Sequence, residues 1–390
     1  MTAHSLPVEL PVRNPRQTSC FFRTPDPGNG RKALVQITER CNLHCAHCSV
    51  SAGARGEDLP AGSFRRIVLP RLREAGVRRV TLTGGEPFLH PDLLRFCHDL
   101  RAADIEVGIC TNGTSIGDKD IEAMRRAGGI HVTVSLDGFR PGSHGKFRGL
   151  RSSFDVTVAT TRALGEAGLL RGLVCTPNTL CERSEFADLC DFAVESGARY
   201  VLMNSLSSFG RGVKSRRPLA ADEAMMRGIV QDTAPRAAAG LEILHVRFPA
   251  GARPENHAPS RCSAGRLVMV LPDGTTSVCP YLVYAARTPG SRYSAAQFTA
   301  GNILREEVAA ALDRIETWIA DRTAASSRPS RCAACPVRTG CGGGCPACVI
   351  ANGGLLTDAD LSECPPAAAP ESAAGHGSRL SRGRVLCETR

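Results

Sequence analysis

Three cysteines and two histidines fall within one short segment, Cys41–Cys48, whose sequence is CNLHCAHC. The cysteines follow the spacing C-x3-C-x2-C and can present three thiolates from one loop. A structural zinc site needs four ligands, and either imidazole in the segment could provide the fourth. Three cysteines without a nearby fourth also suit an iron–sulfur cube that keeps one iron open for a small molecule. The spacing alone leaves both kinds of metal site open.

The bulk composition is typical of a globular protein in a reducing compartment. A chain of 390 residues with 42% apolar residues can bury a sizeable core and has room for two domains. No apolar run approaches the ~20 residues that cross a bilayer, and the N-terminus lacks a secretory leader pattern. We therefore expect no membrane partner and a cytoplasmic location, where stable disulfides are unusual. Eighteen cysteines in such a compartment indicate metal or iron–sulfur ligation.

The formal net charge of +10 comes almost entirely from arginine. The basic residues are scattered through helical segments, and aromatic residues that could stack on bases are not interleaved with them. We therefore expect no nucleic-acid partner.

Short apolar runs rich in β-branched residues alternate with segments of helical spacing from Ala33 onward. Most of the helical segments end at or just before a glycine, a common helix stop. The runs that predict strands are 33–38, 78–84, 105–110, 130–136, 170–176 and 199–205. Strands that alternate with helices pair in parallel through right-handed crossovers. The pattern therefore predicts an α/β fold, a partial (βα)6 TIM-like barrel that falls short of the eight units of a complete one.

Composition and periodicity also suggest where the chain divides. The expected parts are an N-terminal arm (1–32), the partial barrel (33–215), a bridging helix and strand (216–260), a small cysteine-rich domain (261–365) and a tail (366–390). The tail is low in apolar residues, so we expect it to be disordered.

Further polar and glycine-rich motifs follow the predicted strands. The second strand ends in the turn Gly84–Pro87 (GGEP), the third is followed by Asn112, and the fourth ends near Ser135 and Asp137. The carboxyl ends of barrel strands face one mouth, so these residues should lie near the cysteines. Glycines let a backbone approach a ligand closely, and Glu86 could accept a hydrogen bond from an ammonium group. Each motif alone could be a turn, but the ordered set predicts a ligand site.

C-x3-C-x2-C with GGEP at the next strand end closely resembles the radical S-adenosylmethionine (SAM) superfamily, over roughly residues 33–210. The resemblance implies a [4Fe–4S] cluster on Cys41, Cys45 and Cys48, with the SAM amine and carboxylate on the fourth iron. It implies that a reductant such as flavodoxin or ferredoxin drives cleavage of SAM. The resulting 5′-deoxyadenosyl radical would then take a hydrogen atom from a substrate, with the hard chemistry supplied by the cofactor. Which side chains act on the substrate is left open.

The same resemblance implies which residues contact SAM. Gly84, Gly85 and Glu86, with Pro87 completing the turn, would meet the methionine moiety, and His47 would flank the adenine. The other implied contacts, some on the ribose or sulfonium side, are Asn112, Ser135 and Asp137.

A second group of cysteines lies in the C-terminal part of the chain. It consists of Cys262-x11-Gly274-x4-Cys279, then Cys332-x2-Cys335-x5-Cys341-x3-Cys345, Cys348 and Cys364. By itself this spacing could be a zinc ribbon. The remaining barrel cysteines lack ligand spacing and are expected to be small apolar fillers: Cys97, Cys110, Cys175, Cys181 and Cys190.

After a radical SAM barrel, this spacing resembles the SPASM extension, which holds two auxiliary [4Fe–4S] clusters. The resemblance implies an inner cluster on Cys262, Cys279 and Cys345. It implies an outer cluster on Cys332, Cys335, Cys341 and Cys364. Many members have another cysteine soon after the first, whereas SAGRLVMV follows Cys262 here. The inner cluster therefore either keeps an open iron that a substrate could occupy or takes Cys348 as its fourth ligand.

The resemblance predicts a radical SAM/SPASM oxidoreductase or lyase of natural-product or cofactor biosynthesis. The favoured substrate is a ribosomally made precursor peptide that is oxidised, crosslinked, epimerised or decarboxylated, with a separate leader-binding protein or direct docking. The alternative is a dehydrogenase, dehydratase or decarboxylase of a small metabolite such as an aminocyclitol, sugar nucleotide or tetrapyrrole. Sulfatase maturation is disfavoured because Pro280-Tyr281, and not aspartate, follows Cys279. A non-catalytic zinc protein is a distant alternative, since it leaves the Gly84–Pro87 turn unexplained.

Overall fold

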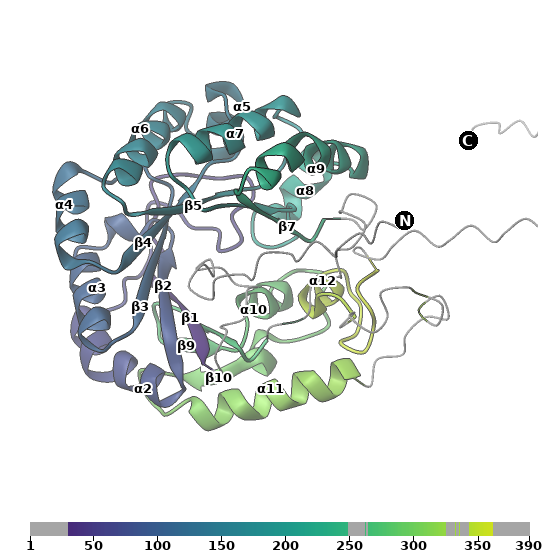
Figure 1. Ribbon diagram of the computed structural model, residues 1–390. Helices are drawn as coiled ribbons and strands as arrows, with labels where there is room; N and C mark the ends of the chain where they lie inside the picture. Colours follow the sequence, from purple (N-terminus) through teal and green to yellow (C-terminus); the bar gives the residue numbers. More distant parts are fainter. Residues whose placement is uncertain are drawn as a thin grey trace, which may run out of the picture.

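A computed structural model describes residues 30–248, 262, 264–324, 332, 335 and 343–361. Nearly all of the expected N-terminal arm, the whole tail, and Cys341 and Cys364 lie outside the described residues. The described strands form one ten-stranded sheet in the order β10-β9-β8-β1-β2-β3-β4-β5-β6-β7. The sheet curves so that its strands partly enclose an interior, as in an opened barrel (Figure 1).

Seven neighbouring strands are parallel and supply the barrel wall. They are β1 (Arg31–Thr38), β2 (Val77–Gly84), β3 (Glu106–Thr111), β4 (Ile130–Ser135), β5 (Leu170–Cys175), β6 (Tyr200–Asn204) and β7 (Glu242–Val246). The six strands predicted from the sequence are all present, and the α/β fold class with a parallel sheet is confirmed.

β7 differs from the sequence-based expectation. The segment around it was predicted to bridge two domains, but β7 pairs in parallel with β6 along its whole length. It is therefore a seventh wall strand. The position of an edge strand depends on the strand that it pairs with. No motif near residue 242 shows in the sequence that this segment pairs with β6. The division of the chain into domains stays a prediction.

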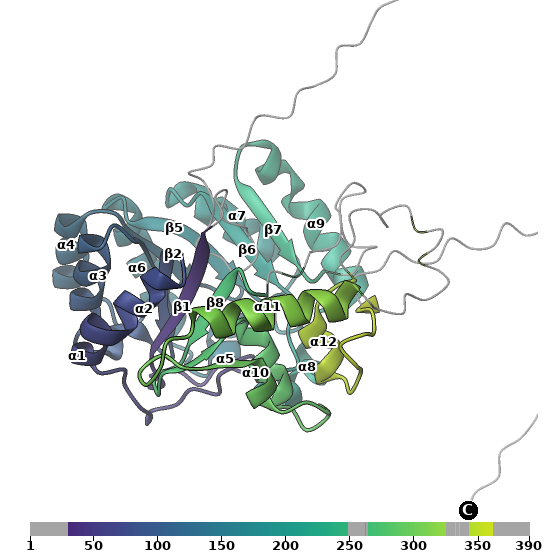
Figure 2. The ribbon, with the colours of Figure 1, turned by 90° about the horizontal axis from the view of Figure 1, so that it is seen from below.

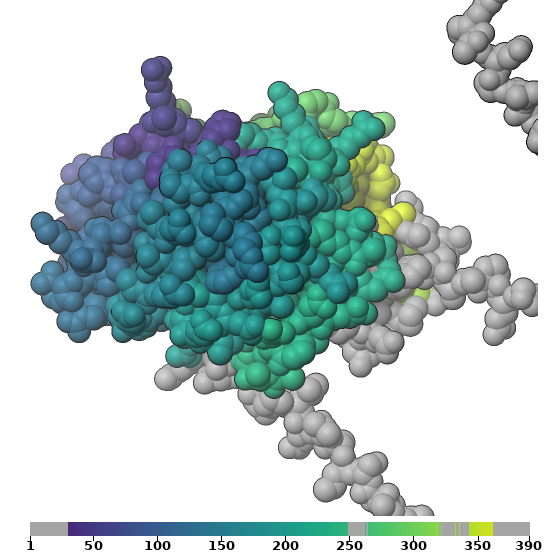
Figure 3. Space-filling model, turned by 90° about the horizontal axis from the view of Figure 1, so that it is seen from above, coloured from purple at the N-terminus to yellow at the C-terminus, as the bar shows by residue number. Residues whose placement is uncertain are grey.

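Most of the helices that connect these strands cover the outside of the wall. The connecting helices are α1 (Ala61–Ser63), a π-helical turn (Phe64–Val68), α2 (Leu69–Glu74), α3 (Leu93–Ala102), α4 (Asp118–Ala127), α5 (Pro141–Arg148), α6 (Ser153–Glu166), α7 (Ser184–Glu195), α8 (Gly212–Leu219) and α9 (Glu223–Ala238). Of these, α5 and α8 also contribute residues to cavities beside the strand ends. Figure 1 shows α2, α3, α4, α6, α7 and α9 in an arc outside the strands, and Figure 3 shows the rounded outer face that the blue and teal helices form.

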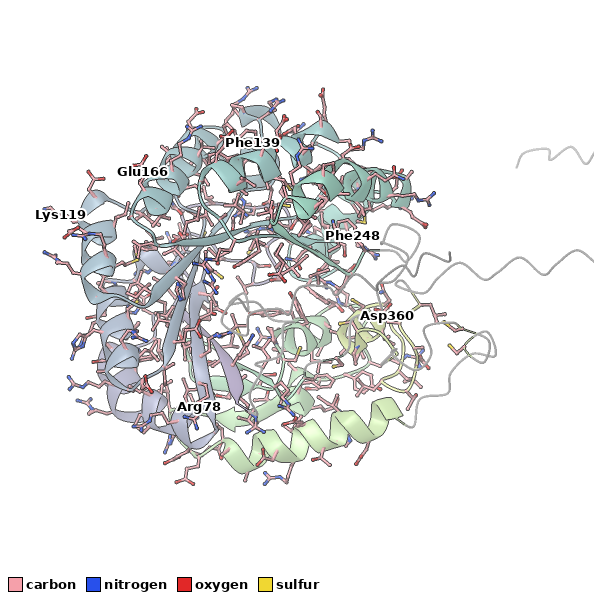
Figure 4. All side chains as sticks on the ribbon, in the orientation of Figure 1. Arg78, Lys119, Phe139, Glu166, Phe248 and Asp360 are labelled. Atoms are coloured by element: carbon pink, nitrogen blue, oxygen red, sulfur yellow. The ribbon has the colours of Figure 1, made fainter. Side chains whose placement is uncertain are left out.

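The amphipathic pattern of the helices explains this arrangement. α3 buries Leu93, Phe96, Cys97 and Leu100, which lie on one helical face because they are three or four residues apart. On the solvent side, the exposed Lys119 of α4 and Glu166 of α6 point away from the strands (Figure 4). The helices therefore seal the outer face of the sheet and leave the strand ends free for a site.

The cysteine-rich region starts within the same sheet. β8 (Leu267–Val270) pairs in parallel with β1, and β9 (Thr275–Ser277) and β10 (Thr299–Asn302) extend the sheet in antiparallel fashion. The remaining elements are α10 (Pro280–Ala286), a 3₁₀ turn (Ala295–Phe298), α11 (Ala309–Ala324) and α12 (Pro346–Ala351). α10 and α12 lie side by side on the open side of the barrel (Figures 1 and 2). The shared sheet fixes this region against the barrel.

No helix in the described parts of the chain is both long and apolar enough to cross a membrane.

The barrel wall gives a stability prediction. Gly172 in β5 faces Tyr200 in β6, and a Cβ at this glycine would lie 2.5 Å from ring atoms of the tyrosine. We expect Gly172→Ala to lower the free energy of unfolding by about 1–3 kcal/mol, because a buried ring cannot move without disturbing its neighbours. The control is Gly142→Ala in α5, where nothing lies within 4 Å of the added methyl group. Urea unfolding measures both, and equal stabilities would contradict the prediction.

Candidate functional site

The cysteine loop that follows β1 is held at its root by Arg40. The Arg40 guanidinium donates to Asp58 Oδ1 at 3.1 Å, to Asp58 Oδ2 at 2.6 Å and to the Leu89 carbonyl at 2.8 Å. One residue further on, the Cys41 amide donates to the Gly53 carbonyl at 2.6 Å. The loop therefore leaves the strand along a defined path, and the first cysteine is buried.

The far side of the loop is held by α5 and by Arg211. The amides of His44 and Ala46 donate to the carbonyls of Arg148 and Phe147, at 3.2 and 2.9 Å. The Arg211 side chain donates to the Cys45 carbonyl at 2.8 Å. It also donates to the carbonyl of Ala52, at 2.7 Å. Arg211 therefore fixes the cysteine loop from the side opposite to Arg40.

The Gly84–Gly85 pair lies where the end of β2 meets the root of the loop. The amides of Gly85 and Glu86 donate to the carbonyls of Thr38 and Arg40, at 2.9 and 2.8 Å. A Cβ on Gly84 would lie 2.2 Å from the Thr38 oxygen, and one on Gly85 would lie 2.1 Å from the Arg40 oxygen. Both positions exclude a side chain because the two backbones touch there.

A cavity of about 220 Å³ lies between the loop and the strand ends. All three loop cysteines line it, together with five of the eight predicted cofactor-binding residues: His47, Gly84, Gly85, Asn112 and Ser135. The wall also contains Arg148, which no sequence motif indicates, and Cys110, which spacing alone predicts to be a filler. The structure thus brings the cysteines and most of the strand-end residues to one cavity.

Glu86 lies behind this wall and is fully buried, and Pro87 next to it is also buried. Its carboxylate accepts hydrogen bonds from the Thr111 hydroxyl and the Asn112 amide, both at 2.7 Å, and from the Phe88 amide at 3.2 Å. Burial raises the pKa of Glu86 although these hydrogen bonds oppose the shift. In this position Glu86 joins the ends of β2 and β3. Its predicted contact with an ammonium group stays a prediction.

His47 stacks on Phe147, with ring centres 4.6 Å apart and planes 5° from parallel. Burial lowers the pKa of His47 to about 4, although the carboxylate of Asp137 opposes the shift, so the imidazole is neutral at pH 7. Its Nδ1 atom is buried and finds no hydrogen-bond partner among the described residues. A buried polar atom without a partner is costly, so Nδ1 marks a place where a ligand group can bind.

Asp137 and Arg148 form a buried ion pair beside the loop. Arg148 Nε donates to Asp137 Oδ2 at 2.7 Å, and Asp137 Oδ1 accepts from the Thr176 amide at 2.6 Å. Burial alone would raise the pKa of Asp137, but the Arg148 charge, together with His47, His144 and the Thr176 amide, outweighs it and holds the pKa below its usual value. The guanidinium also reaches Cys45, with Nη1 3.9 Å from the sulfur. Asp137 thus orients a cation that lines the cavity, and does not line it itself.

These residues fit a [4Fe–4S] cube with a bound SAM molecule. Among the described residues, no three His, Cys, Asp or Glu side chains are grouped as a single metal ion requires. In a cube each cysteine binds a different iron atom, so the sulfurs do not converge on one point. The cavity is also lined by the buried Arg148, whose guanidinium could bind a carboxylate. It is lined by His47 as well, whose Nδ1 has no partner among the described residues. Cys41, Cys45 and Cys48 would hold the cube.

Two of the cysteines assigned to the inner auxiliary cluster act electrostatically on the third. Cys279 lies within electrostatic reach of both Cys262 and Cys345, although the three belong to separate segments. Burial raises the pKa of Cys279 to about 12, and the two neighbouring thiols add to this shift. The sulfur of Cys348 lies beside that of Cys345, because the two side chains share a hydrogen bond.

The outer cluster is described only in part. The Cys335 amide donates to the Cys332 carbonyl at 3.4 Å, so these two cysteines share one turn. The other two predicted ligands, Cys341 and Cys364, lie outside the described residues.

Comparison with known proteins gives matches over most of the chain. A sequence model of the Radical SAM superfamily matches residues 35–190. The PqqA peptide cyclase of Streptomyces rochei is 27% identical over 87% of this chain and 95% of its own length. The mycofactocin maturase MftC of Mycobacterium tuberculosis (strain H37Rv) is 26% identical over 90% of this chain and 85% of its own.

Among solved structures, Streptococcus suis SuiB bound to S-adenosylmethionine has the same fold. Its TM-score is 0.67 at 18% identity, over 85% of this chain and 77% of that chain. SuiB bound to the precursor peptide SuiA also gives a TM-score of 0.67, over 85% of this chain and 75% of that chain. The likeness includes both the barrel and the region after it.

The buried ion pair yields a prediction for Asp137→Asn. The change leaves the Arg148 charge buried without its counterion, so we expect the free energy of unfolding to fall by about 3–5 kcal/mol. Asp155→Asn on the exposed side of α6 is the matched control, with an expected loss under about 1 kcal/mol. Chemical denaturation of the two variants measures the difference. A loss of similar size in both would show that the pair does not hold the site.

Proposed function

Because the chain belongs to the radical SAM superfamily and carries a SPASM extension, we propose that it modifies a precursor peptide in cofactor or natural-product biosynthesis. The observation that carries the chemistry is the single cavity that collects three loop cysteines, the Gly84–Gly85 turn and a buried arginine. When bound there, the cluster and SAM supply an organic radical that abstracts a hydrogen atom from the substrate.

The residues of the chain bind, orient and shield these groups. The Arg148 guanidinium, fixed by Asp137, is the cation that would meet the SAM carboxylate. The neutral His47, stacked on Phe147, would offer its unpartnered Nδ1 to the adenine side. The side-chain-free Gly84–Gly85 turn would let the backbone approach the methionine part. Val50 and Met269 make part of the wall apolar, which helps to exclude water.

A peptide substrate is supported by the relatives. Two proteins that align with most of this chain are a PqqA peptide cyclase, which is named for peptide chemistry, and a mycofactocin maturase. SuiB, which shares the fold, has been solved with a precursor peptide. We propose in addition a flavodoxin or ferredoxin as reductant and a separate leader-binding protein. A small metabolite is the alternative substrate.

The iron content and the reaction of SAM test the cofactor assignment. Anaerobically reconstituted protein should contain about twelve iron atoms per chain, as three cubes require. With dithionite and SAM it should form 5′-deoxyadenosine. We expect Cys45→Ala to lose about four irons and all 5′-deoxyadenosine, since one cube needs each of its three cysteines.

Cys97→Ala is the control, because Cys97 is buried in α3 outside the cavity and should leave both readouts unchanged. Stoichiometric zinc with little iron, or an unchanged reaction in Cys45→Ala, would contradict the proposal.

The substrate class can be tested by isotope transfer. The enzyme is incubated with a deuterated synthetic peptide that corresponds to a short open reading frame beside its gene. We expect deuterium in 5′-deoxyadenosine and an altered peptide mass, because the radical takes hydrogen directly from its substrate. Unlabelled 5′-deoxyadenosine and an unchanged peptide would instead favour a small metabolite.

A further inference from the structure

Two cysteines of the inner cluster have equivalent positions. Cys279 and Cys345 each lie directly before a proline that begins a short helix, α10 or α12. The two helices pack side by side (Figures 1 and 2), and Cys262 lies within electrostatic reach of Cys279. Cys279 thus has one sulfur from each of two other segments within electrostatic reach. The segment after Cys262 contains no cysteine that could be the fourth.

Cys348 brings a fourth sulfur to this group. It lies three residues after Cys345, and its amide donates to the Cys345 carbonyl at 2.9 Å. Residues three apart in a helical turn project from the same face, and here the two side chains share a hydrogen bond. The turn is fixed from the other side by Asp360, which accepts from the Cys345 amide at 3.2 Å and is labelled beside α12 in Figure 4.

A buried arginine faces the same sulfur. Arg247 follows β7, is 7% exposed, and places Nη1 3.9 Å from Cys348 Sγ. Its guanidinium carbon lies 4.9 Å from the ring centre of Tyr281 and 5.9 Å from that of Phe209. Its Nε atom finds no acceptor in the described part of the chain. In the described part of the chain, the guanidinium contacts this sulfur and the two rings, and no carboxylate forms an ion pair with it.

The backbone at Arg247 is also strained, with φ at +57°. A side-chain-bearing residue rarely adopts this left-handed conformation, and it persists only where the surroundings hold it. A buried cation likewise needs a compensating negative charge close by. The thiolates of a cluster at Cys345 and Cys348 would be that charge.

We propose that Cys348 is the fourth cysteine ligand of the inner auxiliary cluster and that Arg247 is the cation that positions and balances its thiolate. The inference rests on the proposed function, because it needs auxiliary clusters in the C-terminal region. It decides between the two alternatives that the sequence leaves open. With four cysteines the inner cluster has no open iron, so the substrate does not coordinate it, and the cluster serves to carry electrons.

The ligand can be tested in full-length protein that carries Cys41→Ala, Cys45→Ala and Cys48→Ala, so that only auxiliary clusters remain. A cube with four cysteine ligands should resist mild ferricyanide oxidation, whereas one with three loses its open iron and becomes [3Fe–4S]. We expect no [3Fe–4S] EPR signal from this parent protein. Adding Cys348→Ala should create the signal and release about one iron per chain. Adding Cys190→Ala, a buried cysteine of α7, should not.

Two results would overturn the assignment. One is a [3Fe–4S] signal already in the parent, which would mean that the inner iron is open. The other is a Cys348→Ala variant that matches the parent in both readouts. Failure of the proposed function looks different, since unmodified protein would then contain no iron–sulfur cluster and form no 5′-deoxyadenosine.

Arg247 is tested through the reduction potential. Arg247→Met removes a positive charge beside one cluster, so we expect the midpoint potential of that auxiliary cluster to fall while iron content stays the same. Arg247→Lys should restore part of the shift, because it returns the charge. Arg216 and Arg247 both line a cavity of about 160 Å³ beside Cys348, but Arg216 donates to Ser208, so Arg216→Met is the control. An unchanged potential in Arg247→Met would overturn the role of Arg247.

Discussion

The site depends above all on one buried ion pair, between Asp137, two residues after β4, and Arg148 at the end of α5. The guanidinium of Arg148 reaches Cys45, while its carbonyl accepts from the His44 amide. One residue thus fixes the cysteine loop through its backbone and supplies a cation to the cavity through its side chain. A lone charge buried there would be unfavourable, and the carboxylate of Asp137 makes it tolerable.

The continuous sheet fixes the cysteine loop relative to the cysteine-rich region, much as the ion pair fixes the loop within the site. β8 pairs with β1, the strand that leads into the cysteine loop, and β9 leads to Cys279. The loop and Cys279, one of the inner auxiliary cysteines, therefore follow strands of the same sheet. Their relative placement is set by backbone hydrogen bonds and not by a linker. Such rigidity suits a system in which electrons pass between fixed clusters, as we propose for this chain.

Much of the fold could be predicted because its signals are local. Alternating apolar runs and helical spacing place six wall strands, and the spacing of the cysteines gives the loop. Other features depend on contacts between distant segments. β7 becomes a wall strand only through its pairing with β6. Glu86 binds Thr111 and Asn112 because β2 and β3 are neighbours. Arg148 and Arg247 are single arginines in an arginine-rich chain, and what distinguishes them is burial together with a contact to a cysteine sulfur.

The central claim is that the loop cysteines hold a cube whose fourth iron binds SAM. Low-temperature EPR of the dithionite-reduced protein, recorded with and without SAM, tests it most directly. We expect SAM to change the signal of one cluster, and Cys48→Ala to abolish that change while auxiliary signals remain. A spectrum that does not respond to SAM, or one that responds equally in Cys48→Ala, would contradict the account.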